Sequence, residues 1–200
     1  MGGICLIRLG HVRPSRLPAL CGLTSENAAH RVAVSWREEG RLRHGVYIPR
    51  RDTNSVMNRV VGGRFFPGVH HPALFTVMES EDQVSVSMRS LDRVARVEVQ
   101  AHLSDRLSPG SVFSSLAEAS QFFQDGSLGF SATDQCDCHE GLQLITDRWR
   151  VEPLELEHVA SSFFSDQHVF AAGSVEFDSA LLMRNVPCRW VREPALRAAA

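Results

Sequence analysis

Apolar and polar residues alternate along much of this chain, and this alternation restricts the possible folds more than any other feature. In one early run, His30, Val32, Val34 and Trp36 occupy every second position and share a face, while the residues between them form the other face. A period of two is typical of strands that bury one side. The sequence therefore predicts a protein built mainly from half-buried strands.

The alternation recurs between short turns, which predicts an antiparallel meander following an early hairpin. The two helices expected among the strands are Asn54–Val61, capped by Asp52 or Thr53, and Ser115–Gln124, which opens with a capping box. Many short strands with two inserted helices predict a mainly β (α+β) fold, an antiparallel barrel that is closed or nearly closed. The expected strands are Ile4–Ile7, His30–Trp36, Leu42–Ile48, Ala73–Glu79, Gln83–Arg89, Val94–Ala101, Gly141–Thr146, Trp149–Glu157 and Ser174–Met183.

Length and composition fit a single domain. The 200 residues include 44% hydrophobic side chains, enough for one core. We expect one domain over residues 1–193, followed by a frayed tail over residues 194–200. An early arginine-bearing segment without acids faintly resembles a transit peptide, but we favour a buried strand at Ile4–Ile7.

Charge and cysteine usage exclude several classes of partner. The net charge is −2 and the sequence has no basic stripe, so no nucleic-acid partner is expected. The sequence also lacks an apolar run long enough to cross a membrane, so no membrane association is expected. Its five cysteines are odd in number and scattered, which favours reduced thiols and a cytoplasmic location. No cofactor is expected.

Several stretches resemble, in their order and spacing, the YqjF-like family of uncharacterised proteins. The resemblance runs from Gly3 to about Trp190. It implies the β-barrel fold of the acetoacetate-decarboxylase superfamily and, because the family has no established activity, it implies little beyond that fold. The stretches are Gly3–Gly10, Thr24–Asn27, Gly45–Asp52, Gly62–His71, Ala117–Phe123, Gly129–Thr133 and Gly173–Asp178.

The same resemblance argues against decarboxylase chemistry. In acetoacetate decarboxylase a strand glutamate lies in the pocket, and a Phe-Pro-Lys-Lys segment supplies a Schiff-base lysine. Glu26 is similar in position to that glutamate, and Phe66-Pro67 to the Phe-Pro, which places the lysine positions near Gly68 and Val69. A Schiff base needs a primary amine, and every one of the 21 basic residues here is an arginine. Decarboxylase activity is therefore not expected.

Family members also carry a segment ahead of their first matching strand. This chain opens directly on the strand at Ile4. The resemblance therefore implies that an N-terminal strand of the barrel is missing.

Glu26 and His30 lie four apart, which on a strand places them on one face together with the valines that follow. An inward glutamate needs a partner, because burial of an unpaired charge is costly. Arg50, Arg51, Arg59 and Arg64 are the arginines we expect to provide it. One interpretation is a pocket that binds a carboxylate or carbonyl ligand through arginine, with Glu26 as acid or base. The other is a structural ion pair.

The histidine pair His70-His71 completes the candidate pocket. Neutral imidazoles act as bases or ligands near neutral pH, but adjacent strand residues point to opposite faces. One histidine packed inside and one at the surface is therefore the simpler interpretation. The full set of candidate pocket residues is Glu26, His30, Arg50, Arg64, His70 and His71.

Two further motifs have simpler explanations. Arg50-Arg51-Asp52 lies between a strand and a helix, where anions often bind, but Asp52 as a helix cap beside solvated arginines is the plainer interpretation. The cluster Cys136-Asp137-Cys138-His139 lacks a second ligand pair at zinc spacing, so no metal site is expected.

Three functions remain open at this point. The first is a small-molecule-binding barrel, and the second is a lysine-independent lyase or hydratase that uses Glu/His acid–base catalysis. The third is a structural or interaction protein. Acidic and arginine side chains beside an enclosed cavity would favour the first two, and a cavity filled by side chains would favour the third.

Overall fold

The computed structural model describes residues 1–12, 23–38, 40–56, 68–133 and 138–197. Within these residues the protein is mainly β and contains one helix, which confirms the predicted class. The elements are β1 (Gly2–Val12), β2 (Leu23–Glu38), β3 (Arg41–Thr53), β4 (His70–Glu79), β5 (Gln83–Ser90), β6 (Arg96–Leu103), α2 (Leu116–Asp125), β7 (Leu128–Ala132), β8 (Cys138–Ile145), β9 (Glu152–Ser161), β10 (Ala180–Leu182) and β11 (Arg189–Arg197).

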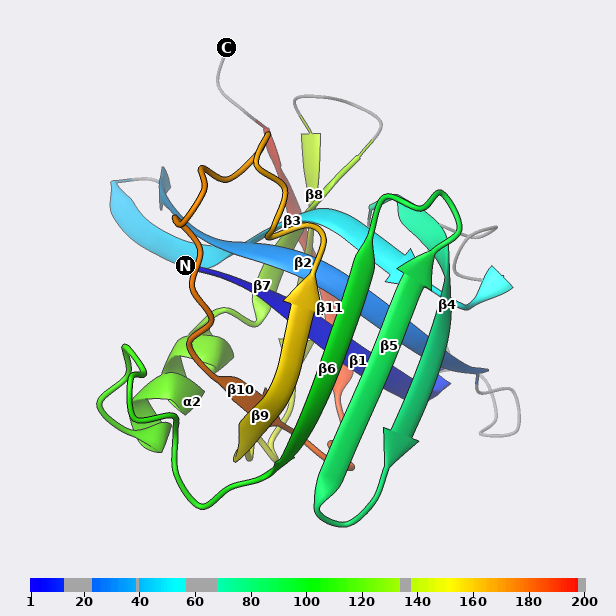
Figure 1. Ribbon diagram of the computed structural model, residues 1–200. Coiled ribbons are helices and arrows are strands. Elements are labelled where there is room, and N and C mark those ends of the chain that lie inside the picture. Colours follow the sequence, from blue (N-terminus) through cyan, green and yellow to red (C-terminus); the bar gives the residue numbers. More distant parts are fainter. Residues whose placement is uncertain (13–22, 39, 57–67, 134–137, 198–200) are drawn as a thin grey trace.

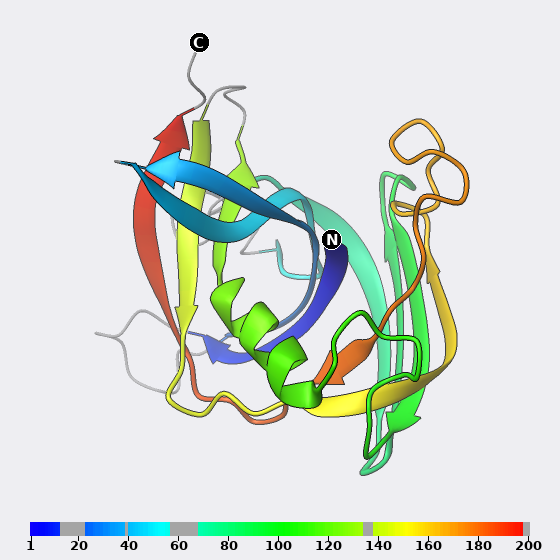
Figure 2. The ribbon, with the colours of Figure 1, turned by 90° about the vertical axis from the view of Figure 1, so that its left-hand side faces the viewer.

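The strands belong to one sheet, ordered β10-β9-β6-β5-β4-β3-β7-β8-β11, with β2 paired to β3 and β1 paired to β2. We call β1, β2, β3, β7, β8 and β11 the curled half, and β4, β5, β6, β9 and β10 the meander half. In Figure 2 the curled half bends around an interior, while the meander half stands beside it. The described strands do not close into a barrel.

The expectation of a wholly antiparallel sheet is wrong at two places. Strand β3 pairs in parallel with β7 through Val46–Ile48 and with β4 through Arg51–Thr53. Parallel neighbours need a crossover connection rather than a tight turn. The local turn signals in the sequence report only the antiparallel pairs, and those were predicted correctly for β2–β3, β4–β5 and β5–β6.

The hydrophobic core lies where the two halves face each other. Figure 1 shows the strands of the meander half crossing β1 and β2 at a large angle. Small side chains, such as Ala28 from β2 and Ala73 from β4, let the layers approach, and Met88 of β5 is fully buried between them. Partly buried Ile4, Leu6, Phe75 and Val99 extend this cluster.

Helix α2 crosses one opening of the curled half (Figure 2). As predicted, Ser115 caps it: the Ser115 hydroxyl accepts a hydrogen bond from the Glu118 amide. The Glu118 carboxylate accepts one from the Ser114 amide at 2.8 Å, one residue before the usual capping-box donor. Ala119 is the buried residue of the helix, and the chain leaves it at Gly126.

Several boundaries differ from expectation. Most of the expected helix Asn54–Val61 lies outside the described residues. The expected strand Ser174–Met183 contracts to β10. Residues 194–197, expected to be frayed, belong instead to β11, which pairs with β8. A register shift between Glu193 and Leu196 accommodates Pro194, since proline cannot donate to a ladder.

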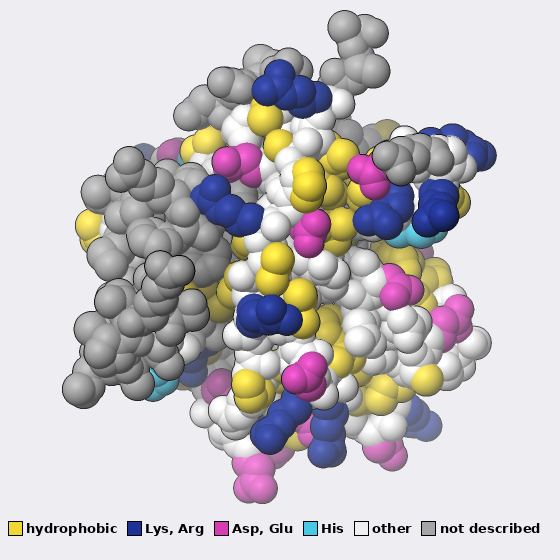
Figure 3. Space-filling model, turned by 180° about the vertical axis from the view of Figure 1, so that it is seen from behind, with side chains coloured by type: hydrophobic (Ala, Val, Ile, Leu, Met, Phe, Trp, Pro, Cys, Tyr) yellow, Lys and Arg dark blue, Asp and Glu magenta, His cyan; other side chains and the backbone are white. Residues whose placement is uncertain are grey.

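None of the described helices is long and apolar enough to cross a membrane. Seen from behind, the described surface carries arginine and acidic side chains interspersed with one another (Figure 3).

Candidate functional site

Strand alternation in β3 divides the predicted site residues between two faces. The side chains of Arg50 and Asp52 face the meander half, where Arg50 donates to Asp52 and to Asp92. Arg51, between them, faces the interior of the curled half and reaches Ser131 of β7. His70 pairs in register with Arg51, and His71 pairs with Asp52, so the two histidines also separate. The expectation that adjacent histidines point to opposite faces is therefore confirmed.

A small cavity of about 30 Å³ lies inside the curled half. A buried water needs about 10–15 Å³, so the cavity holds roughly two waters or a few heavy atoms. Its walls come from β1, β2, β3, β8 and β11 of the curled half and from the first residue of β4. The lining residues are Cys5, Ile7, Leu9, Asn27, Ala28, Ala29, Arg51, Asp52, His70, Leu142 and Trp190.

Arg51 is the charged group of this interior. Its Nε donates a hydrogen bond to the Ser131 hydroxyl at 2.9 Å. Burial, and then the positive charge of Arg31, lower the pKa of Arg51 to about 10, so the guanidinium stays charged at neutral pH. Arg31 itself has a buried Nε without a hydrogen-bond partner. Among the described residues, no carboxylate lies within ion-pair distance of either arginine.

His70 is held beside Arg51 in one tautomer. Its Nδ1 lies 3.1 Å from the Gly68 carbonyl oxygen, which can only accept, so Nδ1 carries the proton and Nε2 does not. Burial, and then the charge of Arg51, lower the pKa of His70 to about 4. At neutral pH the cavity therefore combines a permanent cation with a neutral imidazole that can accept a proton.

Gly68 is what allows His70 to sit there. Its φ is +90°, a conformation that favours glycine, and a Cβ at this position would lie 2.6 Å from the Ser131 Cβ. The Gly68 amide donates to the Glu140 carboxylate at 3.2 Å. The backbone before β4 can therefore pass close to β7, which brings His70, Arg51 and Ser131 together.

On the other face of β3, a buried polar network joins the halves of the sheet. Asp52 is fully buried and accepts hydrogen bonds from both Nε and Nη2 of Arg50. Arg50 Nη2 also donates to Asp92, at 2.9–3.0 Å, in the turn between β5 and β6. His71 Nδ1 lies 3.3 Å from the same carboxylate. The plainer interpretation, with Asp52 as a helix cap beside solvated arginines, is wrong for these residues.

The network sets the charge states of its members. Burial lowers the pKa of Arg50, but the hydrogen bonds that Arg50 donates to Asp52 and Asp92, and the charges of these carboxylates, outweigh burial, so the pKa is raised. Burial raises the pKa of Asp92, but hydrogen bonds from Ser90, the Val94 amide and Arg50 bring it well below its ordinary value. Both ions of the Arg50–Asp92 pair are thus charged across the physiological range.

Glu26 lies at a different place from the two histidine sites. It pairs in register with Arg8 of β1, and Arg8 Nε donates to its carboxylate at 2.5 Å. The expected arginine partner is therefore present, but it is Arg8 rather than one of the four arginines proposed. The Glu26 side chain is 18% exposed and that of Arg8 49%, so the pair lies near solvent. Glu26 does not line the cavity that contains His70.

His30 is the most buried of the predicted residues, with no exposed surface. Burial, and secondarily the charge of Arg50, lower its pKa, although Asp52 opposes the shift. Arg64 lies outside the described residues, as do Cys136 and Asp137 of the suspected metal motif. Within the described part of the chain, no group of three or more potential ligands could hold a metal ion.

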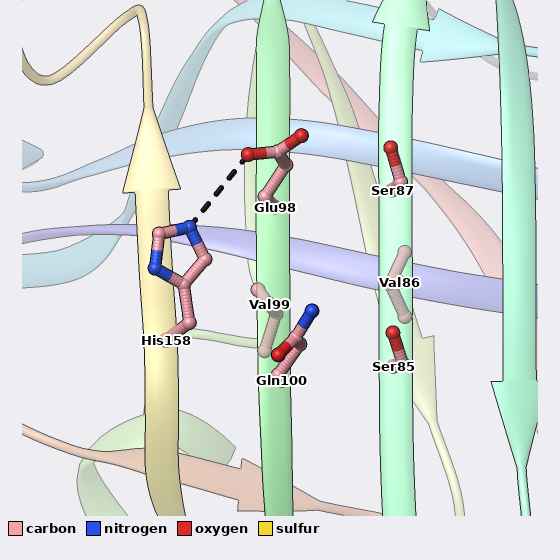
Figure 4. Close-up of a pocket in the computed structure, with 7 residues that line it drawn as sticks. All are labelled: Ser85, Val86, Ser87, Glu98, Val99, Gln100 and His158. Carbon is pink, nitrogen blue, oxygen red and sulfur yellow. Dashed lines mark ion pairs between the residues drawn. The ribbon is translucent and has the colours of Figure 1, made fainter.

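A second hollow lies on the outer face of the meander half (Figure 4). It has a volume of about 350 Å³, and Ser85, Ser87, Glu98, Gln100 and His158 line its floor. His158 lies 3.6 Å from Glu98, which also binds Arg96. Val86 and Val99 lie behind the polar side chains in this view. Its charged groups already have partners, so this groove offers no free charge for a ligand.

Sequence reasoning named Arg51 as a possible partner for Glu26 and as part of the Arg50-Arg51-Asp52 motif. It did not propose Ser131, Cys5 or Asp92 as site residues. The sequence did contain a signal for the direction of the Arg51 side chain. Alternation in Arg50-Arg51-Asp52 already places Arg50 and Asp52 on one face and Arg51 on the other. The contact with Ser131 spans 80 residues and leaves no local signal.

Acid should destabilise the protein through His70. Its folded pKa of about 4 lies below its ordinary 6.5, so the unfolded chain binds the proton more readily between these values. The contribution is fully present above pH 6.5 and is lost as the pH falls toward 4. One such group changes the free energy of unfolding by about 1.4 kcal/mol per pH unit between these two pKa values. We expect the free energy of unfolding, measured in urea at pH 7, 6, 5 and 4, to fall with this slope.

A matched pair of variants isolates His70. His70→Gln should reduce the pH dependence of the free energy of unfolding by the contribution of about one proton. His44→Gln, at an exposed histidine, should leave this pH dependence unchanged. Equal slopes in the wild type and His70→Gln would show that His70 is not buried as described.

Searches for related proteins returned nothing that identifies the chain. No protein-family model matches it, and no curated protein is similar to it. Membership of the YqjF-like family therefore stays a prediction that depends on the segments quoted above.

Proposed function

We propose that this protein binds a small molecule carrying a carboxylate or carbonyl group inside the curled half, with Arg51 as the anchor. The observation that carries the proposal is the uncompensated positive charge there. Arg51 lines the cavity and feels the charge of Arg31, and no described carboxylate lies within ion-pair distance of either arginine, since the Asp52 carboxylate is paired with Arg50. Unpaired buried charge is costly, and a bound anion would remove that cost.

The cavity limits the size of the ligand. About 30 Å³ admits only a few heavy atoms, so we expect a short carboxylate rather than a long-chain acid. Guanidinium groups bind carboxylates through paired, charge-assisted hydrogen bonds. Ile7, Leu9 and Leu142 supply an apolar wall for a short alkyl chain beside the charged end.

A lysine-independent lyase or hydratase is the second candidate, and the tautomer of His70 favours it. Nε2 of His70 is unprotonated at neutral pH and belongs to a residue that lines the same cavity as Arg51. It could accept a proton from a ligand held by Arg51. Glu26 cannot share this role from its position beside Arg8, so the acid–base function falls to the histidine.

The fold family and the cellular location of the protein are also proposals. We retain the YqjF-like family, with its acetoacetate-decarboxylase-like fold, as a proposal, which the mainly β architecture supports. Schiff-base catalysis stays excluded from it, because the chain has no lysine. The thiols of Cys5, Cys138 and Cys188 are free, which supports a reducing, cytoplasmic location.

Calorimetric titration with propionate at pH 7 tests the proposal, with propionamide as the neutral analogue. Trp190 lines the cavity, so tryptophan fluorescence gives a second readout. Arg51→Gln should weaken binding of propionate about 10- to 100-fold, the value of a lost charge-assisted hydrogen bond.

Arg96→Gln provides the control, since Arg96 lies on the outer face of the meander half, paired with Glu98. It should bind propionate as the wild type does. Binding that is absent in the wild type for both compounds, or equal in Arg51→Gln, would contradict the proposal and favour a structural protein. Equally strong binding of propionamide would show that Arg51 holds a carbonyl oxygen rather than a carboxylate.

A further inference from the structure

His30 is a polar side chain without a polar partner. It has no exposed surface, and both of its ring nitrogens are buried without a hydrogen bond. The Asp52 Oδ2 atom lies 3.9 Å from Nδ1, which is too far for a hydrogen bond. A neutral imidazole in this position forgoes two hydrogen bonds that it would make in water. Such an arrangement persists only while something keeps water out.

Residues 162–179, between β9 and β10, keep it out (orange in Figure 1). The Phe163 ring lies 4.7 Å from the His30 ring, centre to centre. Phe164 and Phe170 pack on Phe163 and on each other, so the three rings form one cluster that meets His30 through Phe163. We call residues 162–179 the aromatic cover.

The central part of the aromatic cover is attached to the rest of the protein by apolar contacts alone. Ser162 anchors its start through hydrogen bonds to β6, and Asp178 anchors its end through Ser111 and the Val112 amide. Between these anchors, the hydrogen bonds of the described residues 163–174 are made within residues 161–174. The Phe163–His30 contact is therefore part of what keeps the cover closed.

The charges around His30 come mainly from β3. Asp52 lies opposite its Nδ1, and Arg50 already occupies both oxygens of that carboxylate. Asp92 and His71 reach the cluster through Arg50. On the other side, β1 presents Ile4 in register with His30. The titratable residues of the aromatic cover itself are Asp166, His168, Glu176 and Asp178, of which His168 and Glu176 are exposed.

We propose that the aromatic cover is a pH-sensitive lid: it closes over His30 while the imidazole is neutral and opens when His30 takes up a proton. A protonated ring has two donors, and the closed state offers at most one acceptor, Asp52. The other donor must reach water. β2 is paired along its length with β1 on one side and β3 on the other, so it cannot move easily. The central part of the cover, residues 163–174, has no hydrogen bond to the other described residues outside 161–174 to lose.

The lowered pKa of His30, for which burial is the main cause, agrees with this coupling. If His30 stays neutral while it is covered and has an ordinary pKa once it is exposed, proton uptake by His30 favours opening of the aromatic cover. Opening should become about tenfold more favourable for each pH unit below 6.5, until His30 titrates in the closed state.

Hydrogen exchange measured by mass spectrometry tests the lid at pH 7.0, 6.0 and 5.0, after correction for intrinsic exchange rates. Amides of residues 163–174 should lose protection by about tenfold per unit below pH 6.5, relative to amides of β5. His30→Leu should abolish this dependence, and His168→Leu should keep it, because His168 is the exposed histidine of the lid. Protection in the wild type that does not change with pH, or that falls equally in His30→Leu, would overturn the proposal.

Phe163→Ala provides a test that does not depend on replacing His30. Without the covering ring, His30 should meet water, and its pKa measured by NMR should rise toward 6.5. A His30 pKa that stays as low in Phe163→Ala as in the wild type would show that Phe163 is not what excludes the proton.

Discussion

Asp52→Asn should lower the free energy of unfolding by about 3 kcal/mol, one of the largest losses available to a single substitution in this protein. The carboxylate is fully buried and accepts three of the hydrogen bonds that Arg50 donates. The neutral amide leaves that guanidinium without its buried counter-ion. We expect the low end of the roughly 3–5 kcal/mol range for a broken buried pair, because Asp92 still binds Arg50. Urea unfolding followed by tryptophan fluorescence measures the loss.

A double-mutant cycle with Arg50→Gln separates the pair from its surroundings. The double variant should lose less than the sum of the single variants, because neither then leaves a stranded charge. Glu98→Gln, in an exposed pair with Arg96, serves as the control and should not differ resolvably from the wild type. Additive losses, or a single-variant loss below about 1 kcal/mol, would show that Arg50 and Asp52 do not act as a buried pair.

Met88→Ala should cost about 3 kcal/mol, within the usual 2–5 kcal/mol for truncating a buried methionine. Met88 has no exposed surface and lies in the cluster that joins the two halves of the sheet. Its removal leaves a cavity that the paired strands around it cannot close. Guanidinium unfolding of Met88→Ala and of the wild type measures the loss.

Met78→Ala is the matched control, because Met78 is 65% exposed on β4. It should change stability by no more than about 0.5 kcal/mol. Equal losses at the two methionines would mean that the halves do not pack through the face that contains Met88.

The parts of the fold that sequence reasoning located are those with local signals. Strands β4, β5 and β6 were placed within a few residues, because short polar turns separate clear alternation. Helix α2 was found from the capping residues Ser115 and Glu118. Strand β7 was missed because its five residues, Leu128–Ala132, are too short to show a period. Strand β11 was missed because Pro194 suggested the end of ordered structure.

For the candidate site, alternation predicted which side chains share a face but not what they meet. It separated His70 from His71 correctly. It could not show that Glu26 would pair with Arg8, since that contact depends on the register of β1 against β2. The parallel pairing of β3 with both β4 and β7 also left no local trace, yet it is what assembles Arg51, His70 and Ser131.

An experimental structure of crystals grown with and without propionate tests the ligand site most directly. We expect a carboxylate in the cavity of the curled half, within hydrogen-bond distance of the Arg51 guanidinium, and waters in its place when propionate is absent. Arg51 paired instead with a carboxylate of the chain itself, with apolar side chains filling the cavity in both crystals, would contradict a ligand-binding interior.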